Sequence, residues 1–97
     1  MKIVFLPAAV DDLEWFRRYY QQVFPDGAQK ATDQYQKAIH LLGQRPKLGH
    51  PIAERGIREY AIPRTPFSFI YRTQGGRIEV LRFWDQRGDR SEHWIDE

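Results

Sequence analysis

The fold is decided by residues 56–83, which read GIREYAIPRTPFSFIYRTQGGRIEVLRF. This stretch holds three short runs rich in β-branched and aromatic residues, each ended by turn formers, which is typical of β-strands. Gly75 and Gly76 join the last two runs, and because both tolerate positive φ they predict a tight hairpin. Pro63 and Pro66 lack backbone donors, so their link should lie outside the ladder. We therefore expect a three-stranded antiparallel meander, with strands near 57–62, 67–74 and 77–84.

Two strands of this meander carry apolar residues on both faces. Simple alternation places Phe69 and Ile70 on opposite faces of one strand. The same alternation places Val80 on one face of the next strand, and Leu81 and Phe83 on the other. A strand that is apolar on both faces is central in its sheet or backs onto a groove.

Two amphipathic helices are predicted before the meander, over residues 8–24 and 27–43, where apolar residues recur at helical spacing. Pro25 ends the first helix and Gly43 ends the second. Because only about three residues separate the helices, they should pair as an antiparallel hairpin.

The acidic residues of the helices are assigned structural roles. Asp26 should cap the second helix, with Gln29 as its partner in a capping box. Asp11, Asp12 and Glu14 lie early in the first helix, where carboxylates compensate the helix dipole.

The remaining segments complete the fold. Residues 2–6 predict a first strand, and residues 47–55 predict a loop because they show no periodicity. The order β-α-α-β-β-β predicts an α+β fold, with a helical hairpin packed on a small, mostly antiparallel β-sheet. At 97 residues the chain should form one domain, 1–97. Its core should include Leu13, Phe16, Tyr20, Tyr35, Ile39, Leu42, Phe69, Val80 and Leu81.

Composition excludes several classes of site. The chain has no cysteine, so it has no disulfide, thiolate metal site or thiol nucleophile. His40, His50 and His93 stand alone without ligand spacing. No apolar run is long enough to span a membrane, and we expect a cytoplasmic protein that needs no cofactor.

Positive charge is concentrated in the second half of the chain. Residues 45–90 carry ten Lys or Arg and five Asp or Glu, a net +5, whereas the whole chain carries +2. Such a field favours an acidic partner, either nucleic acid or an acidic peptide. The alternative is a solvated surface in which Arg58, Arg72 and Arg82 pair with Glu59, Glu79 and Asp85.

Four stretches, in this order, resemble motifs of the RelE/ParE toxin superfamily. Residues 6–13 (LPAAVDDL) are similar to its opening, a strand followed by Ser-Pro-x-Ala-x-x-Asp-Leu. Residues 41–51 (LLGQRPKLGHP) resemble its Pro-x-x-Gly-x-Pro connection. Residues 56–60 resemble its Val-Arg-Glu strand and residues 69–82 its closing hairpin. The resemblance covers nearly the whole chain.

This resemblance implies the toxin of a type II toxin–antitoxin pair, bound by a small acidic antitoxin in a hetero-oligomer. RelE-like toxins cut mRNA on the ribosome, whereas ParE-like toxins poison DNA gyrase. The lysine pair and strand arginine of RelE fall on Glu59, Ala61 and Ser68, so that basic set is missing. The long opening helices and the Arg-Glu strand favour the ParE branch.

The end of the chain departs from the common ParE ending, Val-x-His-x-x-Arg-Asp. Asp85 stands in place of the histidine and Gly88 in place of the arginine, whereas Asp89 matches. Arg87 and Arg90 are the residues that could compensate.

The leading interpretation is a ParE-like inhibitor of DNA gyrase without a confident catalytic residue. The alternatives are a ribosome-dependent mRNA endonuclease and a family member that binds antitoxin without being toxic. The nuclease would contact phosphates through Arg58, Arg72, Arg82 and Arg87. The residues expected to bind a partner are Arg58, Arg64, Arg72, Arg82, Arg87, Arg90 and Trp84.

Overall fold

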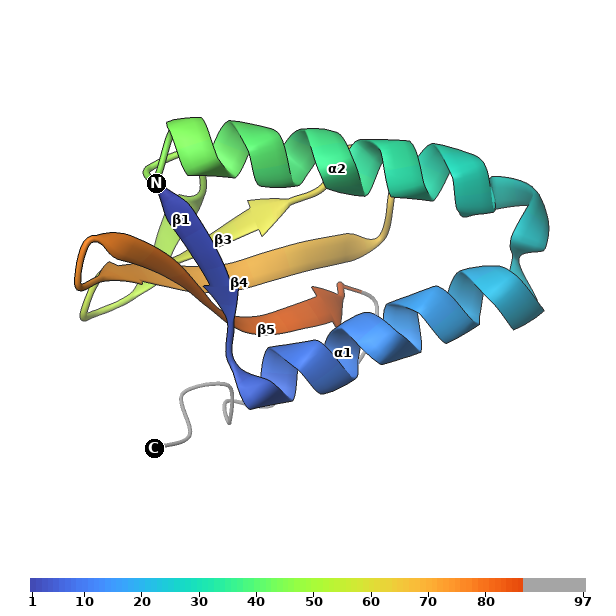
Figure 1. The fold of residues 1–97 in the computed structure, drawn as a ribbon, viewed down its shortest axis with the longest axis horizontal. Coiled ribbons are helices and arrows are strands. Elements are labelled where there is room, and N and C mark those ends of the chain that lie inside the picture. The colour runs from blue at the N-terminus through green and yellow to red at the C-terminus, as the bar shows by residue number, and fades with distance from the viewer. Residues whose placement is uncertain (87–97) are drawn as a thin grey trace.

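The computed structural model describes residues 1–86 and shows two long helices packed on a five-stranded sheet (Figure 1). The strands are β1 (Lys2–Phe5), β2 (His50–Ala53), β3 (Ile57–Ala61), β4 (Phe67–Gln74) and β5 (Arg77–Asp85). The helices are α1 (Pro7–Arg18) and α2 (Ala28–Gln44), joined by a π-helical turn (Tyr19–Val23) and a 3-10 turn (Pro25–Gly27). The α+β fold and the helical hairpin are confirmed.

The sheet has the order β1-β5-β4-β3-β2, and the β3-β4-β5 meander is confirmed. β1 pairs in parallel with β5, because the helical hairpin brings the chain back to the same edge. β2 corrects the expectation of a loop over residues 47–55: His50 pairs with Glu59 and Pro51 with Arg58. The strand is short and contains proline, which sheets tolerate at an edge, so it shows no strand pattern in the sequence.

A β-bulge in β5 corrects the predicted faces of that strand. Ile70 pairs with Arg82 but Tyr71 pairs with Val80, which leaves Leu81 as the extra residue. A bulge breaks the two-residue alternation. Phe83 therefore joins Val80 on the helix-facing side, whereas Leu81 packs with Ile70 on the other side.

The connection between the helices corrects the predicted capping box. Gly27 is the residue before α2, and no side chain of the described chain caps that helix. Asp26 lies in the 3-10 turn, whose backbone closes with the Gly27 amide donating to the Phe24 carbonyl at 3.1 Å. Gln29 donates instead to Asp33, one turn further along α2, at 3.1 Å.

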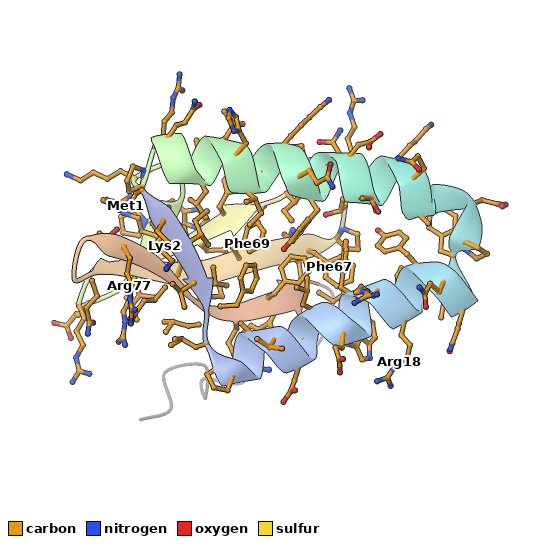
Figure 2. The ribbon with its side chains drawn as sticks, in the orientation of Figure 1. Met1, Lys2, Arg18, Phe67, Phe69 and Arg77 are labelled. Carbon is orange, nitrogen blue, oxygen red and sulfur yellow. The ribbon has the colours of Figure 1, made fainter. Side chains whose placement is uncertain are left out.

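The main core lies between the helices and the sheet and is rich in aromatic rings. The ring of Phe16 on α1 lies edge-on to Phe67 and Phe83, with both centroid distances at 4.9 Å. Figure 2 shows Phe67 and Phe69 between the two helices and the sheet. The predicted core residues that are buried are Phe16, Tyr20, Leu42, Phe69, Val80 and Leu81. Leu13, Tyr35 and Ile39 are only partly buried and pack against this core.

Candidate partner-binding surface

Arg82, a predicted partner-binding residue, is held by α1. Its Nε donates to Asp12 Oδ2 at 2.7 Å and its Nη2 to Asp12 Oδ1 at 2.9 Å. The Asp12 carboxylate raises the pKa of Arg82, because its hydrogen bonds stabilise the cation. Asp12 therefore joins α1 to the sheet, whereas the sequence predicted that it compensates the helix dipole. The alternative in which Arg82 pairs with Asp85 is corrected, because Asp12 is its partner.

Arg58 holds the loop before β2. Its Nη1 donates to the Gly49 carbonyl at 2.6 Å, in place of the ion pair expected with Glu59. The same loop is tied to β4 by Tyr71, whose hydroxyl donates to the Pro46 carbonyl and accepts from the Gly49 amide, both at 2.8 Å. Burial raises the pKa of Tyr71, so its hydroxyl stays protonated as the Pro46 bond requires.

Arg72 takes part in a third group of side-chain interactions, near the turn between β4 and β5. Arg72 Nε donates to Glu79 Oε1 at 3.0 Å, which confirms the pair expected from the sequence. Arg77 binds the other carboxylate oxygen through Nη2 at 2.7 Å. Glu79 is buried, and the bonds from Arg77 and Arg72 hold its pKa below the usual range.

The remaining predicted residues are scattered. Arg64 is exposed in the turn between β3 and β4, with a φ of 64°. Trp84 is half-buried, and the Arg82 guanidinium lies over its ring at 4.7 Å. Arg87 and Arg90 lie outside the described residues. Arg58 lies on the helix-facing side of the sheet and Arg72 on the opposite side, so the described arginines do not form one face.

An exposed apolar stripe follows the first helix toward the tip of the hairpin. Trp15, Val23 and Phe24 expose 48%, 69% and 49% of their surfaces. The Trp15 ring stacks on Tyr19 with the centroids 5.5 Å apart, which fixes it against the helix. Large apolar side chains left exposed together are typical of a surface that a partner covers.

The described residues offer little for metal or acid–base chemistry. No group of three potential metal-binding side chains comes together within residues 1–86. His50 Nε2 lies 3.9 Å from Glu59 Oε1, but its side chain is 67% exposed at the edge strand. In the same part of the chain, no helix has the length and apolar character that crossing a membrane requires.

Comparisons with known proteins agree with this geometry. The model of a family described as the ParE toxin of the type II toxin–antitoxin system parDE matches residues 3–90. A solved structure of a chromosomal ParDE TA system from P. aeruginosa matches with a TM-score of 0.68 and 28% identity. The match covers 86% of this chain and 92% of the other.

No curated protein sequence matches the chain. The family match at residues 3–90 includes every described strand and helix apart from Lys2, the first residue of β1. The solved ParDE structure has a similar fold. The chain belongs to the ParE toxin family of type II toxin–antitoxin systems.

Proposed function

We propose that this chain inhibits DNA gyrase and that a cognate small acidic antitoxin neutralises it in a hetero-oligomer. The observation that carries the proposal is the ParE family match over residues 3–90, together with a 28% identical structure from a ParDE system. Action on gyrase would place the protein in the cytoplasm.

The surface supports a partner of this kind. The exposed apolar stripe of Trp15, Val23 and Phe24 could be covered by an amphipathic segment of the antitoxin. The net +5 of residues 45–90 would attract the acidic residues of that segment. Toxin activity would then be blocked because the bound segment covers the surface needed for the target.

The geometry gives less support to an mRNA endonuclease. Such an enzyme needs cations and a proton-transfer group beside the bound phosphate. Two of the positions that align with the basic set of RelE, Glu59 and Ser68, are buried, and Glu59 is acidic. Arg58 and Arg82, two of the phosphate contacts expected for this alternative, are bonded within the fold.

Purified chain and purified gyrase give the direct test. We expect loss of supercoiling activity or accumulation of cleaved DNA when the chain is added, and filamentation with a DNA-damage response when it is expressed. Co-expression of the antitoxin should restore both. Immediate arrest of translation with intact supercoiling would favour the endonuclease. Normal growth with tight antitoxin binding would indicate a family member without toxicity.

A further inference from the structure

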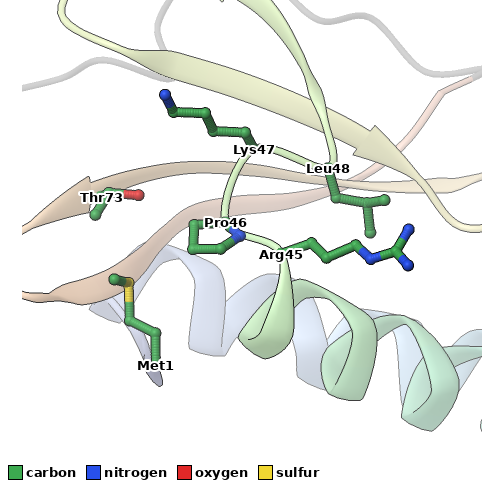
Figure 3. Close-up of a pocket in the computed structure, with 6 residues that line it drawn as sticks. All are labelled: Met1, Arg45, Pro46, Lys47, Leu48 and Thr73. Carbon is green, nitrogen blue, oxygen red and sulfur yellow. The ribbon is translucent and has the colours of Figure 1, made fainter.

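An open pocket lies at the end of the molecule opposite the helical hairpin tip (Figure 3). It has a volume of about 730 Å³, within the range of small ligand sites. Its lining residues are Met1, Arg45, Pro46, Lys47, Leu48 and Thr73. Figure 3 shows the Met1 side chain pointing toward the side formed by Pro46 and Thr73. The floor is therefore made by apolar side chains and the aliphatic parts of polar ones.

Two cations lie beside this apolar floor. Arg45 and Lys47 are exposed and lie in the pocket lining itself. Lys2 and Arg77, which pair in register, lie at the same end of the molecule as Met1 (Figure 2) but on the sheet face opposite the helices, so they do not line the pocket. None of the pocket's lining residues is acidic. The carboxylates of a ligand would meet Arg45 and Lys47 here.

The loop that forms one wall of the pocket is fixed before any ligand arrives. The Tyr71 hydroxyl bonds to the Pro46 carbonyl and the Gly49 amide, and Arg58 bonds to the Gly49 carbonyl. A Cβ on Gly49 would lie 2.6 Å from the Glu59 carbonyl oxygen, so the loop packs directly on β3. A pre-formed wall costs little conformational entropy when a ligand binds.

We propose that this pocket, which we call the Met1 pocket, receives an apolar side chain from an acidic segment of the antitoxin. The apolar floor would bury the side chain, and Arg45 and Lys47 would pair with carboxylates that flank it. A polypeptide fits better than a nucleic acid, because no aromatic ring lines the pocket on which a base could stack. The proposal rests on the proposed function, since it adds a second contact of the same antitoxin, at the end of the molecule opposite the exposed apolar stripe.

Charge reversal tests the cationic rim. Arg45→Glu with Lys47→Glu changes the net charge by −4, and Lys30→Glu with Lys37→Glu on exposed positions of α2 makes the same change away from the pocket. Calorimetry with the antitoxin encoded beside the toxin gene should show binding weakened about tenfold or more by the first pair. The second pair should weaken binding by less than about threefold, because distant surface charges are screened by salt.

Thr73→Tyr tests the apolar floor without changing charge. Thr73 is exposed at the end of β4, where an aromatic residue suits a strand. The larger ring should fill the pocket and weaken antitoxin binding about tenfold. Unchanged thermal unfolding would show that this variant and the charge pairs remain folded.

Met1 is the single methionine of the chain, so a ¹³C-methyl label reports on the pocket with one signal. The antitoxin should shift this signal, and single-stranded DNA or RNA oligonucleotides should not. Tight antitoxin binding that leaves the Met1 signal and all variant affinities unchanged would overturn the Met1 pocket and leave the proposed function standing. A wild-type chain that binds no antitoxin would overturn both, and a shift caused by oligonucleotides alone would assign the pocket to nucleic acid.

Discussion

Asp12 on α1 and Arg82 on β5 form a bidentate ion pair across 70 residues of sequence, with donor–acceptor distances of 2.7 and 2.9 Å. Asp12 Oδ2 also accepts the backbone amide of Phe83 at 2.9 Å. β1 pairs with β5 only as far as Val80, so beyond that residue the edge of β5 is bonded by a side chain of α1. One carboxylate thus joins the helix layer to the sheet and pairs a backbone amide at the strand edge.

Asp12→Ala should lower the free energy of unfolding by about 1–3 kcal/mol, because it leaves the Phe83 amide and the Arg82 guanidinium without their partner. Urea unfolding measures the change. Asp11→Ala is the matched control: Asp11 is exposed, and its loss should cost less than about 0.5 kcal/mol. Equal midpoints for the two variants would show that the pair contributes nothing to stability.

The same pair changes how Arg82 should be tested as a partner-binding residue. Arg82→Glu removes the guanidinium and places a second carboxylate against Asp12. The variant should therefore lose stability as well as binding. Thermal unfolding followed by circular dichroism checks this, with Lys30→Glu at an exposed position of α2 as the control. Identical melting temperatures would show that Arg82→Glu does not affect stability and reports on binding alone.

The buried carboxylate of Glu79 should make the protein sensitive to acid. Arg77 and Arg72 hold its pKa below the unfolded value of about 4.3, so the stabilisation is complete above that pH. It is lost as the pH falls through the folded pKa, because the protonated carboxyl no longer pairs with the arginines. Glu79→Gln should therefore be less stable at pH 7 and show a flatter loss of stability between pH values of about 5 and 2.

Glu54→Gln provides the comparison for this pH series. Glu54 is exposed in the turn between β2 and β3, so its replacement removes a carboxylate without breaking the Glu79 pairs. Its unfolding free energy should follow the wild-type curve across the acid range. A Glu79→Gln curve that also follows the wild type would contradict the assigned role of Glu79.

Tyr71→Phe should lower the free energy of unfolding by about 1–3 kcal/mol, because the Gly49 amide is buried and loses its acceptor. The loop that carries Pro46 would also lose its tie to β4, so antitoxin affinity should fall if the Met1 pocket is used. Tyr60, on the neighbouring strand, is a half-buried residue, and Tyr60→Phe should have a much smaller effect. Chemical denaturation of both variants gives the comparison.

Gly49→Ala should destabilise the fold by about 1–3 kcal/mol, the usual cost of overpacking. The new methyl group would lie 2.6 Å from a backbone oxygen of β3, which cannot move without disturbing the sheet. Gly43→Ala, near the end of α2, meets the Met1 carbonyl oxygen at 3.4 Å and Ile3 Cδ1 at 3.8 Å, which are ordinary contacts. It should be neutral or stabilising by up to about 1 kcal/mol, since alanine favours helix. Thermal unfolding that ranks the two variants in the opposite order would refute this packing argument.

Much of the architecture follows from the sequence, because it depends on local chemistry. The Gly75-Gly76 turn, the apolar periodicity of the helices and the β-branched runs each act over a few residues, and they predicted the helical hairpin and the meander. The ordered motifs between residues 6 and 82 indicated the family that the comparison over residues 3–90 confirms. The pairing of Arg72 with Glu79 could also be predicted from the sequence, because the two residues face each other across a hairpin.

Tertiary structure alone decided the features that depend on distant partners. The bulge at Leu81 turns Phe83 toward the helices, and no local signal marks it, because a bulge is set by the pairing of two strands. Asp12 bonds to Arg82 on β5, and Arg58 donates to the Gly49 carbonyl in the loop before β2. The Met1 pocket joins the start of β1, the end of α2 and the end of β4. Local propensity sets the elements, whereas the packing of remote segments decides which side chains meet and which surface stays open.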